Sequence, residues 1–137
     1  MKYIHYRSGY KYQLAADFSI VVDVHPTEPI ETEFIRLEPD GTLFIRSGYA
    51  WDGPSGPTID TKKTFMRGSV VHDALYQLIR FKKLPPETRE QADIALHQIC
   101  REDGMCKLRA WYVFRSVRRL AGFAADPANK KRVFIVP

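Results

Sequence analysis

Residues 47–58, which read SGYAWDGPSGPT, divide this chain of 137 residues into two parts of different character. The segment contains three glycines and two prolines, so it cannot form a regular helix or a central strand. Its two aromatic residues, Tyr49 and Trp51, are expected to anchor it on the core. Strand-forming sequence precedes the segment and helix-forming sequence follows it, which predicts an α+β fold with an ordered loop between the halves.

The first fifty residues have the composition of β-strands. Residues 12–22 are rich in strand formers, and residues 34–38 and 42–46 lie on either side of the triplet PDG at 39–41. An Asp-Gly pair between alternating runs is a strong hairpin signal. We therefore expect an antiparallel β region in this half.

The remainder of the chain is predicted to form three helices. Apolar residues recur at helical spacing over about residues 65–81. A second helix is expected to start at Pro86 and to end at about residue 103, before Gly104. A third is expected over about residues 107–121, followed by a short strand at 133–136.

These elements together predict an α+β fold in which an N-terminal antiparallel β region packs on a C-terminal three-helix bundle. The length fits a single domain, residues 1–137. Residues 1–50 would form the β region, and residues 51–137 the loop plus the helical region that carries the site.

Composition limits the classes of protein. Hydrophobic residues make up 45% and charged residues 27%, as in soluble globular domains, and no apolar run approaches the roughly 20 residues of a membrane span. The start, MKYIH, has no signal-peptide pattern, and two cysteines, Cys100 and Cys106, suit a reducing compartment. The expected location is therefore inside a cell. The net charge of +5 favours anionic partners such as phospholipid, nucleic acid or an acidic protein.

The first predicted helix carries the candidate site. His72 and Asp73 are adjacent and point about 100° apart, while Tyr76 follows His72 by one helical turn. The short link to the second helix predicts an antiparallel pair, which would place Asp93 opposite His72 or Tyr76. An imidazole held by a buried carboxylate is a general base with a fixed tautomer, and Tyr76 would donate its hydroxyl to the same carboxylate.

The loop before this helix adds oxygen ligands. Its glycine-rich backbone exposes carbonyls, and Asp52 adds a carboxylate. With Asp73 this makes a hard-oxygen site that suits calcium. A calcium ion beside a His–Asp dyad polarises a carbonyl while the histidine activates water.

Three blocks of sequence resemble a family of small uncharacterised phage and prophage proteins, a domain of unknown function. In chain order they are WDGPSGP at 51–57, HDALY at 72–76, and Arg89 followed by Ala92-Asp93. The resemblance covers about residues 47–120. It implies that the chain is a phage or prophage protein, located in the bacterial cytoplasm or associated with a virion.

The same blocks, over about residues 51–100, also resemble bacterial phospholipase A2. In that family an Asp-Gly loop precedes a His-Asp-x-x-Tyr helix, and an aspartate follows on the antiparallel helix. The resemblance implies His72 as general base and Asp93 as its partner. It also implies Asp52, Asp73 and a backbone carbonyl near Gly53 as calcium ligands.

The chain departs from the phospholipase pattern where the secreted enzymes have a disulfide. Ser69 stands three residues before His72, and Pro54 stands in the loop. The joint loss of both cysteines suits a reducing compartment. Because Pro54 has no N–H group, Gly53 and Ser55 would have to serve as donors to an oxyanion.

Three functional hypotheses follow. The first is a calcium-dependent ester hydrolase of the phospholipase A2 type that acts on phospholipid. The second is a non-catalytic phage accessory or virion-associated protein that keeps the His–Asp site as a structural or partner-binding feature. The third is a nucleic-acid binder that uses the third helix.

Individual residues also have ordinary structural explanations. Asp93 is spaced for an i,i+4 ion pair with Arg89, which is compatible with the dyad. His97 is spaced to share a transition metal with Asp93, but the phosphohydrolases with a His-Asp pair need a further upstream histidine on a helix, and His5 and His25 both lie in the β region. We therefore expect His97 at the surface or in a helix seam.

The third helix combines aromatic residues with arginine. Its core stripe is expected to include Ala110 and Val113, and its flanks carry Trp111, Tyr112 and several arginines. Such a pattern suits nucleic acid or an anionic membrane surface. The pattern favours instead a solvated basic face whose aliphatic stems cover the core.

Overall fold

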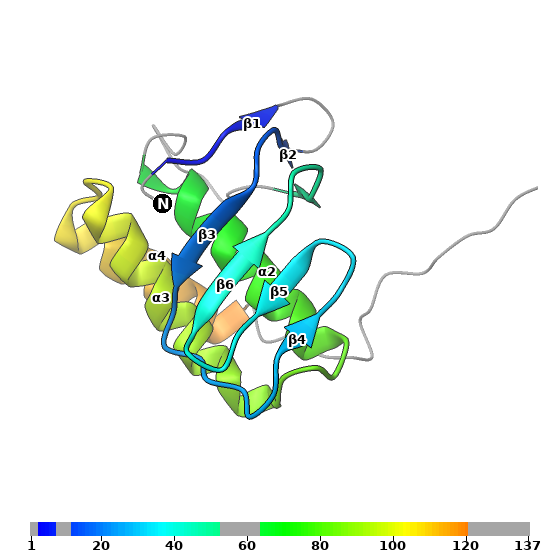
Figure 1. The fold of residues 1–137 in the computed structure, drawn as a ribbon. Coiled ribbons are helices and arrows are strands. Elements are labelled where there is room, and N and C mark those ends of the chain that lie inside the picture. The colour runs from blue at the N-terminus through cyan, green and yellow to red at the C-terminus, as the bar shows by residue number, and fades with distance from the viewer. Residues whose placement is uncertain (1–2, 8–11, 53–63, 121–137) are drawn as a thin grey trace, which may run out of the picture.

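The computed structural model describes residues 3–7, 12–52 and 64–120. Within these residues, two antiparallel sheets occupy the N-terminal half and three α-helices the C-terminal half, so the predicted α+β fold is confirmed. Figure 1 places the larger sheet across the first of these helices. No helix among the described residues is both long enough and apolar enough to cross a bilayer.

The larger sheet has four strands in the order β3-β6-β5-β4. Their bounds are Phe18–Val21 for β3, Thr42–Ile45 for β6, Ile35–Leu37 for β5 and Ile30–Glu31 for β4. Strands β5 and β6 form the predicted hairpin, in which Leu37 pairs with Leu43. Alternate side chains of both strands are fully buried because they face the helices: Ile35, Leu37, Leu43 and Ile45.

The hairpin turn has the chemistry that its sequence indicates. Gly41 adopts a φ of +95°, which disfavours residues with a side chain, and Asp40 Oδ1 accepts a hydrogen bond from the Thr42 amide at 2.9 Å. A Cβ atom on Gly41 would also lie 2.2 Å from the carbonyl oxygen of Val22. Glycine is therefore required here by conformation and by space.

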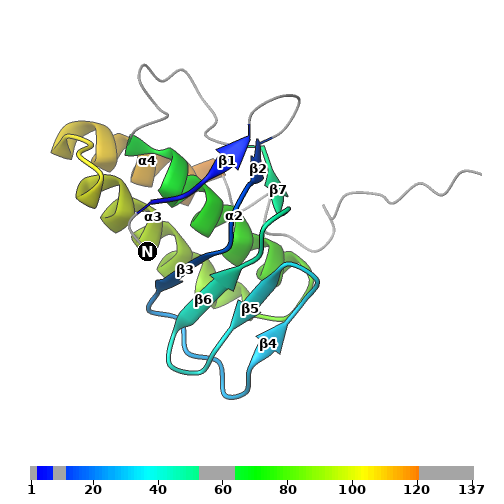
Figure 2. The same ribbon diagram turned by 45° about the horizontal axis from the view of Figure 1, so that its top comes forward.

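The smaller sheet has three strands in the order β1-β2-β7. They span Tyr6–Arg7, Tyr12–Leu14 and Ala50–Trp51. Figure 2 shows this sheet over α2, next to the four-stranded sheet. The stretch 12–22 is thus not one strand, because a bend at residues 15–17 sends β2 and β3 into different sheets. Asp17 stabilises this bend by accepting a hydrogen bond from the Ser47 amide at 2.7 Å.

The helices lie close to their predicted positions. Helix α2 spans Met66–Arg80, α3 spans Arg89–Glu102 and α4 spans Lys107–Leu120, and one turn of 3-10 helix, η1 at Pro86–Thr88, precedes α3. Gly104 follows the end of α3 and has a φ of +102°. The expected strand at 133–136 lies outside the described residues.

Helices α2 and α3 are antiparallel neighbours. Gly68 permits their close approach, since a Cβ there would lie 2.9 Å from Leu96 Cδ1 and 3.2 Å from Cys100 Sγ. Near the start of α2, Arg67 forms ion pairs with Glu102 at 2.8 Å and with Asp103 at 3.0 Å, at the end of α3. This pairing sets the register that brings the middle of α2 opposite the first half of α3.

Candidate functional site

Asp93 of α3 is the centre of a buried polar network. Its side chain has no exposed surface, and both of its oxygens accept hydrogen bonds. Oδ1 lies 2.7 Å from His72 Nε2 and 2.6 Å from the Tyr76 hydroxyl, while Oδ2 lies 2.9 Å from Arg118 Nη1. A buried carboxylate is tolerated as a charge when its lone pairs are satisfied in this way.

Helix α2 positions His72 and Tyr76 as a pair. They are one turn apart, so their rings lie on the same face with centroids 4.1 Å apart. Both residues are buried, with 7% of His72 and 2% of Tyr76 exposed. The structure therefore brings together the three residues, His72, Tyr76 and Asp93, that the spacing and the antiparallel pairing had predicted to meet.

The network holds Asp93 ionised. Burial raises the pKa of its carboxyl, but the hydrogen bonds from His72 and Tyr76, the electrostatic interaction with His72 and the bond from Arg118 outweigh it, so the pKa lies below the ordinary 3.8. Burial, and then the hydrogen bond to Asp93, raise the pKa of Tyr76 above its ordinary value. At neutral pH Tyr76 is therefore a protonated donor to a charged acceptor.

This charge state determines the tautomer of His72. Because the ionised Asp93 only accepts hydrogen bonds, we assign the proton of the 2.7 Å contact to Nε2. In the neutral imidazole the second nitrogen, Nδ1, then keeps its lone pair. The arrangement is that of an imidazole oriented to accept a proton at Nδ1 and stabilised by a carboxylate once it does so.

Arg118 is the member of the network that the sequence did not identify. Helix α4 carries four arginines, and nothing in their spacing distinguishes the one that turns inward. The nearest signal is that Arg118 follows the core position Val117. The Arg118 side chain is 31% exposed, and its backbone carbonyl accepts a hydrogen bond from Arg89 Nη1 at 3.2 Å. Arg89, for which an ion pair with Asp93 was expected, thus links α3 to α4 through this bond.

Of the predicted calcium ligands, Asp73 follows His72 on α2 and points about 100° away from it around the helix. Asp73 is half-buried and Asp52 is exposed, and both have interaction partners. Burial, and then the charge of Asp73 and to a smaller extent that of Asp52, raise the pKa of Tyr49. Gly53 lies outside the described residues, as does Ser55, its expected companion as an oxyanion donor. Among residues 3–7, 12–52 and 64–120, no three acidic, histidine or cysteine side chains are grouped to hold a metal.

The segment before α2 is anchored as its aromatic residues indicate. Trp51 and Tyr49 are 3% and 4% exposed, and their rings are stacked. Trp51 Nε1 donates to Ser69 Oγ at 3.0 Å, and the Tyr49 hydroxyl donates to Gln77 Oε1 at 3.0 Å. Ser69 therefore joins the segment to α2 by a hydrogen bond. The prediction of a loop throughout 47–58 was wrong at Ala50–Trp51, which form the edge strand β7.

His97 occupies a helix seam, in agreement with expectation. Its ring contacts Phe114 of α4 edge-on, with centroids 5.8 Å apart. It belongs to no cluster of potential metal ligands in the described part of the chain. The contact explains the residue as part of the packing between α3 and α4.

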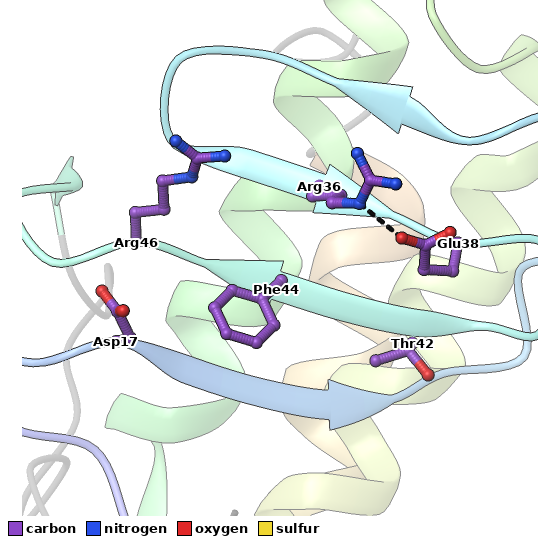
Figure 3. A pocket seen from close by; sticks show the side chains of 6 residues that line it. All are labelled: Asp17, Arg36, Glu38, Thr42, Phe44 and Arg46. Carbon is purple, nitrogen blue, oxygen red and sulfur yellow. Dashed lines mark hydrogen bonds and ion pairs between the residues drawn. The ribbon is translucent and has the colours of Figure 1, made fainter.

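A shallow hollow lies on the outer face of the four-stranded sheet, away from Asp93 (Figure 3). It is lined by Asp17, Arg36, Glu38, Thr42, Phe44 and Arg46. Arg36 pairs with Glu38 and with Glu31, and Arg46 also pairs with Glu31 at 2.6 Å. Because these arginines are neutralised within the sheet, the hollow offers weaker chemistry than the buried network.

Comparison with known proteins identifies the family. The family described as "Protein of unknown function (DUF1353)" matches residues 30–117, which is well over half of the chain. The chain belongs to the DUF1353 family. The DUF1353 match includes His72, Tyr76 and Asp93 and ends one residue before Arg118. The comparisons with curated proteins and with solved structures gave no match.

Proposed function

We propose that this DUF1353 protein is a hydrolase that cleaves a carboxylic ester, in the manner of a phospholipase A2, with His72 as the general base. The observation that carries the proposal is the shared oxygen of Asp93, which accepts hydrogen bonds from His72 Nε2 at 2.7 Å and from Tyr76 at 2.6 Å. This arrangement supports the proposal because it orients the imidazole and uses Nε2 for the bond to Asp93, so that Nδ1 of the neutral ring is the nitrogen that can accept a proton.

In the proposed reaction, Nδ1 of His72 takes a proton from water while the water oxygen attacks the ester carbonyl carbon. The resulting imidazolium is stabilised by ionised Asp93 through the Nε2–H bond. Nδ1 then returns the proton to the leaving alkoxide as the C–O bond breaks. A carboxylic acid and an alcohol are released, and His72 regains its neutral form.

Tyr76 and Arg118 act as positioning residues in this proposal. Tyr76 donates to the same oxygen as His72, and Arg118 donates to the other oxygen at 2.9 Å. Together they restrict rotation of the carboxylate and keep it ionised. The ring of His72 is held both by its bond to Asp93 and by its contact with the Tyr76 ring.

The resemblance to phospholipase A2 supports an acyl ester of an anionic phospholipid as the substrate. It also supports calcium, which would polarise the carbonyl. Asp52 and Asp73 have the right chemistry for this ion, but calcium takes about six to eight oxygen ligands. The described residues supply only these two predicted ligands, so they do not complete a site, and no step above depends on the ion.

The test is hydrolysis of phosphatidylglycerol, presented as vesicles and as a soluble short-chain form, with added calcium or with a chelator. His72→Gln is the informative variant, because its amide nitrogen still donates to Asp93 but cannot accept a proton. We expect it to lower kcat by about 10²–10⁴-fold, the usual contribution of a general base. His97→Gln, on the other helix of the pair, is the matched control and should leave kcat unchanged.

The outcome is read against the melting temperature of each variant. Loss of activity in His72→Gln with a native melting temperature supports the proposal. Absence of fatty acid release by the unmodified chain under every condition, or equal rates for the two variants, overturns it. Activity that depends on calcium and is lost in Asp73→Asn would support the metal as well.

A non-catalytic role is the second candidate, and Arg118 favours it. The carboxylate of Asp93 links α2, α3 and α4, as expected of a network that stabilises the fold. The resemblance to phage and prophage proteins supports an accessory or virion-associated protein of this kind, in the bacterial cytoplasm or on the virion. Under this proposal His72→Gln changes stability alone, and neither lipid form is hydrolysed.

A further inference from the structure

The outer face of α4 exposes large apolar side chains. Leu108 is 76% exposed, Trp111 55% and Tyr112 58%, although scattered exposure of single apolar residues is the normal pattern. These three lie together with two exposed arginines, Arg115 and Arg119. We call these five residues the α4 outer face.

Helix geometry places the five residues on one side. At 100° per residue, Leu108, Trp111, Tyr112, Arg115 and Arg119 fall within an arc of about 100°. The opposite side carries the buried Ala110 and Val113, which contact the core. The aromatic and aliphatic groups of the outer face are therefore not used in packing α4 on α3.

The same helix is strongly basic. It contains one lysine, four arginines and no acidic residue. Arg118 is engaged with Asp93, whereas Lys107, Arg115 and Arg119 are exposed. The Arg115 guanidinium lies over the Trp111 ring, 5.7 Å from its centroid, so cationic and aromatic groups form one surface.

We propose that the α4 outer face binds the surface of an anionic phospholipid bilayer. Apolar and aromatic side chains beside Lys and Arg are the features that let a helix lie in the bilayer interface, where the former enter the acyl boundary and the latter contact headgroup phosphates. A second copy of the chain is a poorer occupant, because two such faces would bring like charges together.

A nucleic acid also offers phosphates, but it does not account for Leu108. Single-stranded nucleic acid is bound by stacking on aromatic rings and by basic side chains, and an aliphatic side chain with 76% of its surface in water gains little there. A bilayer buries this side chain together with Trp111. The aliphatic residue therefore favours lipid over nucleic acid.

Trp111 supplies a direct probe of this surface. The only other tryptophan, Trp51, is 3% exposed and cannot reach lipid, so a blue shift of tryptophan emission on adding vesicles reports Trp111. We expect the shift with vesicles of phosphatidylglycerol and phosphatidylcholine mixed equally. We expect none with pure phosphatidylcholine, and a loss of the shift at high salt.

Charge reversal isolates the surface. Arg115→Glu with Arg119→Glu should weaken sedimentation with the anionic vesicles by more than about tenfold. The control is Lys82→Glu with Lys83→Glu, which changes the net charge by the same amount at two exposed lysines in the turn after α2. It should leave binding unchanged. Leu108→Ala with Trp111→Ala should weaken binding without altering charge.

Three results would overturn the proposal: no binding of the unmodified chain to anionic vesicles, equal loss in both charge reversals, or binding to single-stranded DNA alone. The proposal does not rest on the hydrolase activity. Because vesicle binding is measured by emission and sedimentation, and turnover is also measured on the soluble short-chain lipid, failure of one leaves the other standing.

Discussion

At the scale of single residues, the chemistry of this protein converges on Asp93. One buried carboxylate receives donors of three chemical types, an imidazole, a phenol and a guanidinium. Hydrogen bonds to a charged acceptor stabilise a fold more than those between neutral groups. The buried tyrosines allow this difference to be measured, because Tyr76 donates to the carboxylate of Asp93 and Tyr49 donates to the amide of Gln77.

Tyr76→Phe should lower the free energy of unfolding by about 2–3 kcal/mol, and Tyr49→Phe by about 1 kcal/mol. Both variants remove one hydroxyl from a side chain that is less than 5% exposed, so the loss of buried area is matched. Urea unfolding at neutral pH measures both values. Equal costs would mean that the charge on Asp93 contributes nothing to its bond with Tyr76.

At the scale of elements, the β5–β6 hairpin and the α2–α3 pair are the two units whose sequence and structure agree most closely. Each depends on a glycine: Gly41 in the turn of the hairpin, and Gly68 where α2 and α3 approach closely. Gly41 and Gly48 have nearly the same φ, +95° and +98°, but different surroundings. A Cβ on Gly41 would meet backbone at 2.2 Å, whereas one on Gly48 would meet the Phe34 ring at 3.1 Å.

Gly41→Ala should therefore destabilise the chain more than Gly48→Ala. The unfavourable φ costs about 1 kcal/mol or more at either position. In Gly41→Ala alone, the contact with the Val22 carbonyl also forces β3 or the turn to move. We therefore expect that variant to lose about 3 kcal/mol of unfolding free energy in total. Thermal unfolding of the two variants gives the comparison. A Gly48→Ala variant that is as unstable as Gly41→Ala would show that φ, and not space, determines the cost.

At the scale of the whole molecule, the Asp93 network joins the three helices, while β7 and the Tyr49–Trp51 segment join the smaller sheet to α2. The network couples folding to pH. Burial raises the pKa of Asp93, but its hydrogen bonds lower it further, to below 3.8 in the folded chain. Such a group stabilises the fold fully above the unfolded pKa, and the contribution is lost as the pH falls through the folded pKa.

The free energy of unfolding should therefore decrease as the pH falls below about 3.8, and Asp93→Asn should be less stable at neutral pH, by about 3 kcal/mol, with a shallower acid dependence. Urea unfolding at several pH values down to about pH 2.5 measures both slopes. Asp23→Asn is the control, since that carboxylate is 91% exposed and should leave the curve unchanged. Parallel curves for Asp93→Asn and the unmodified chain would contradict the assignment.

The sequence by itself determined the local elements and which residues share a face. Helical periodicity, Pro86 and Gly104 located the three helices, Asp40-Gly41 located the hairpin, and the one-turn spacing of His72 and Tyr76 put both on one side of α2. The short link between α2 and α3 then sufficed to predict the meeting with Asp93. These features depend on backbone geometry that repeats every few residues, so they are readable along the chain.

Only the tertiary structure decided that Arg118 completes the network, that residues 12–22 divide between two sheets, and that Leu108 and Trp111 face outward. Each of these depends on how one element is rotated against another. That rotation results from the packing of many side chains distant in sequence, so the spacing of residues along α4 does not predict it.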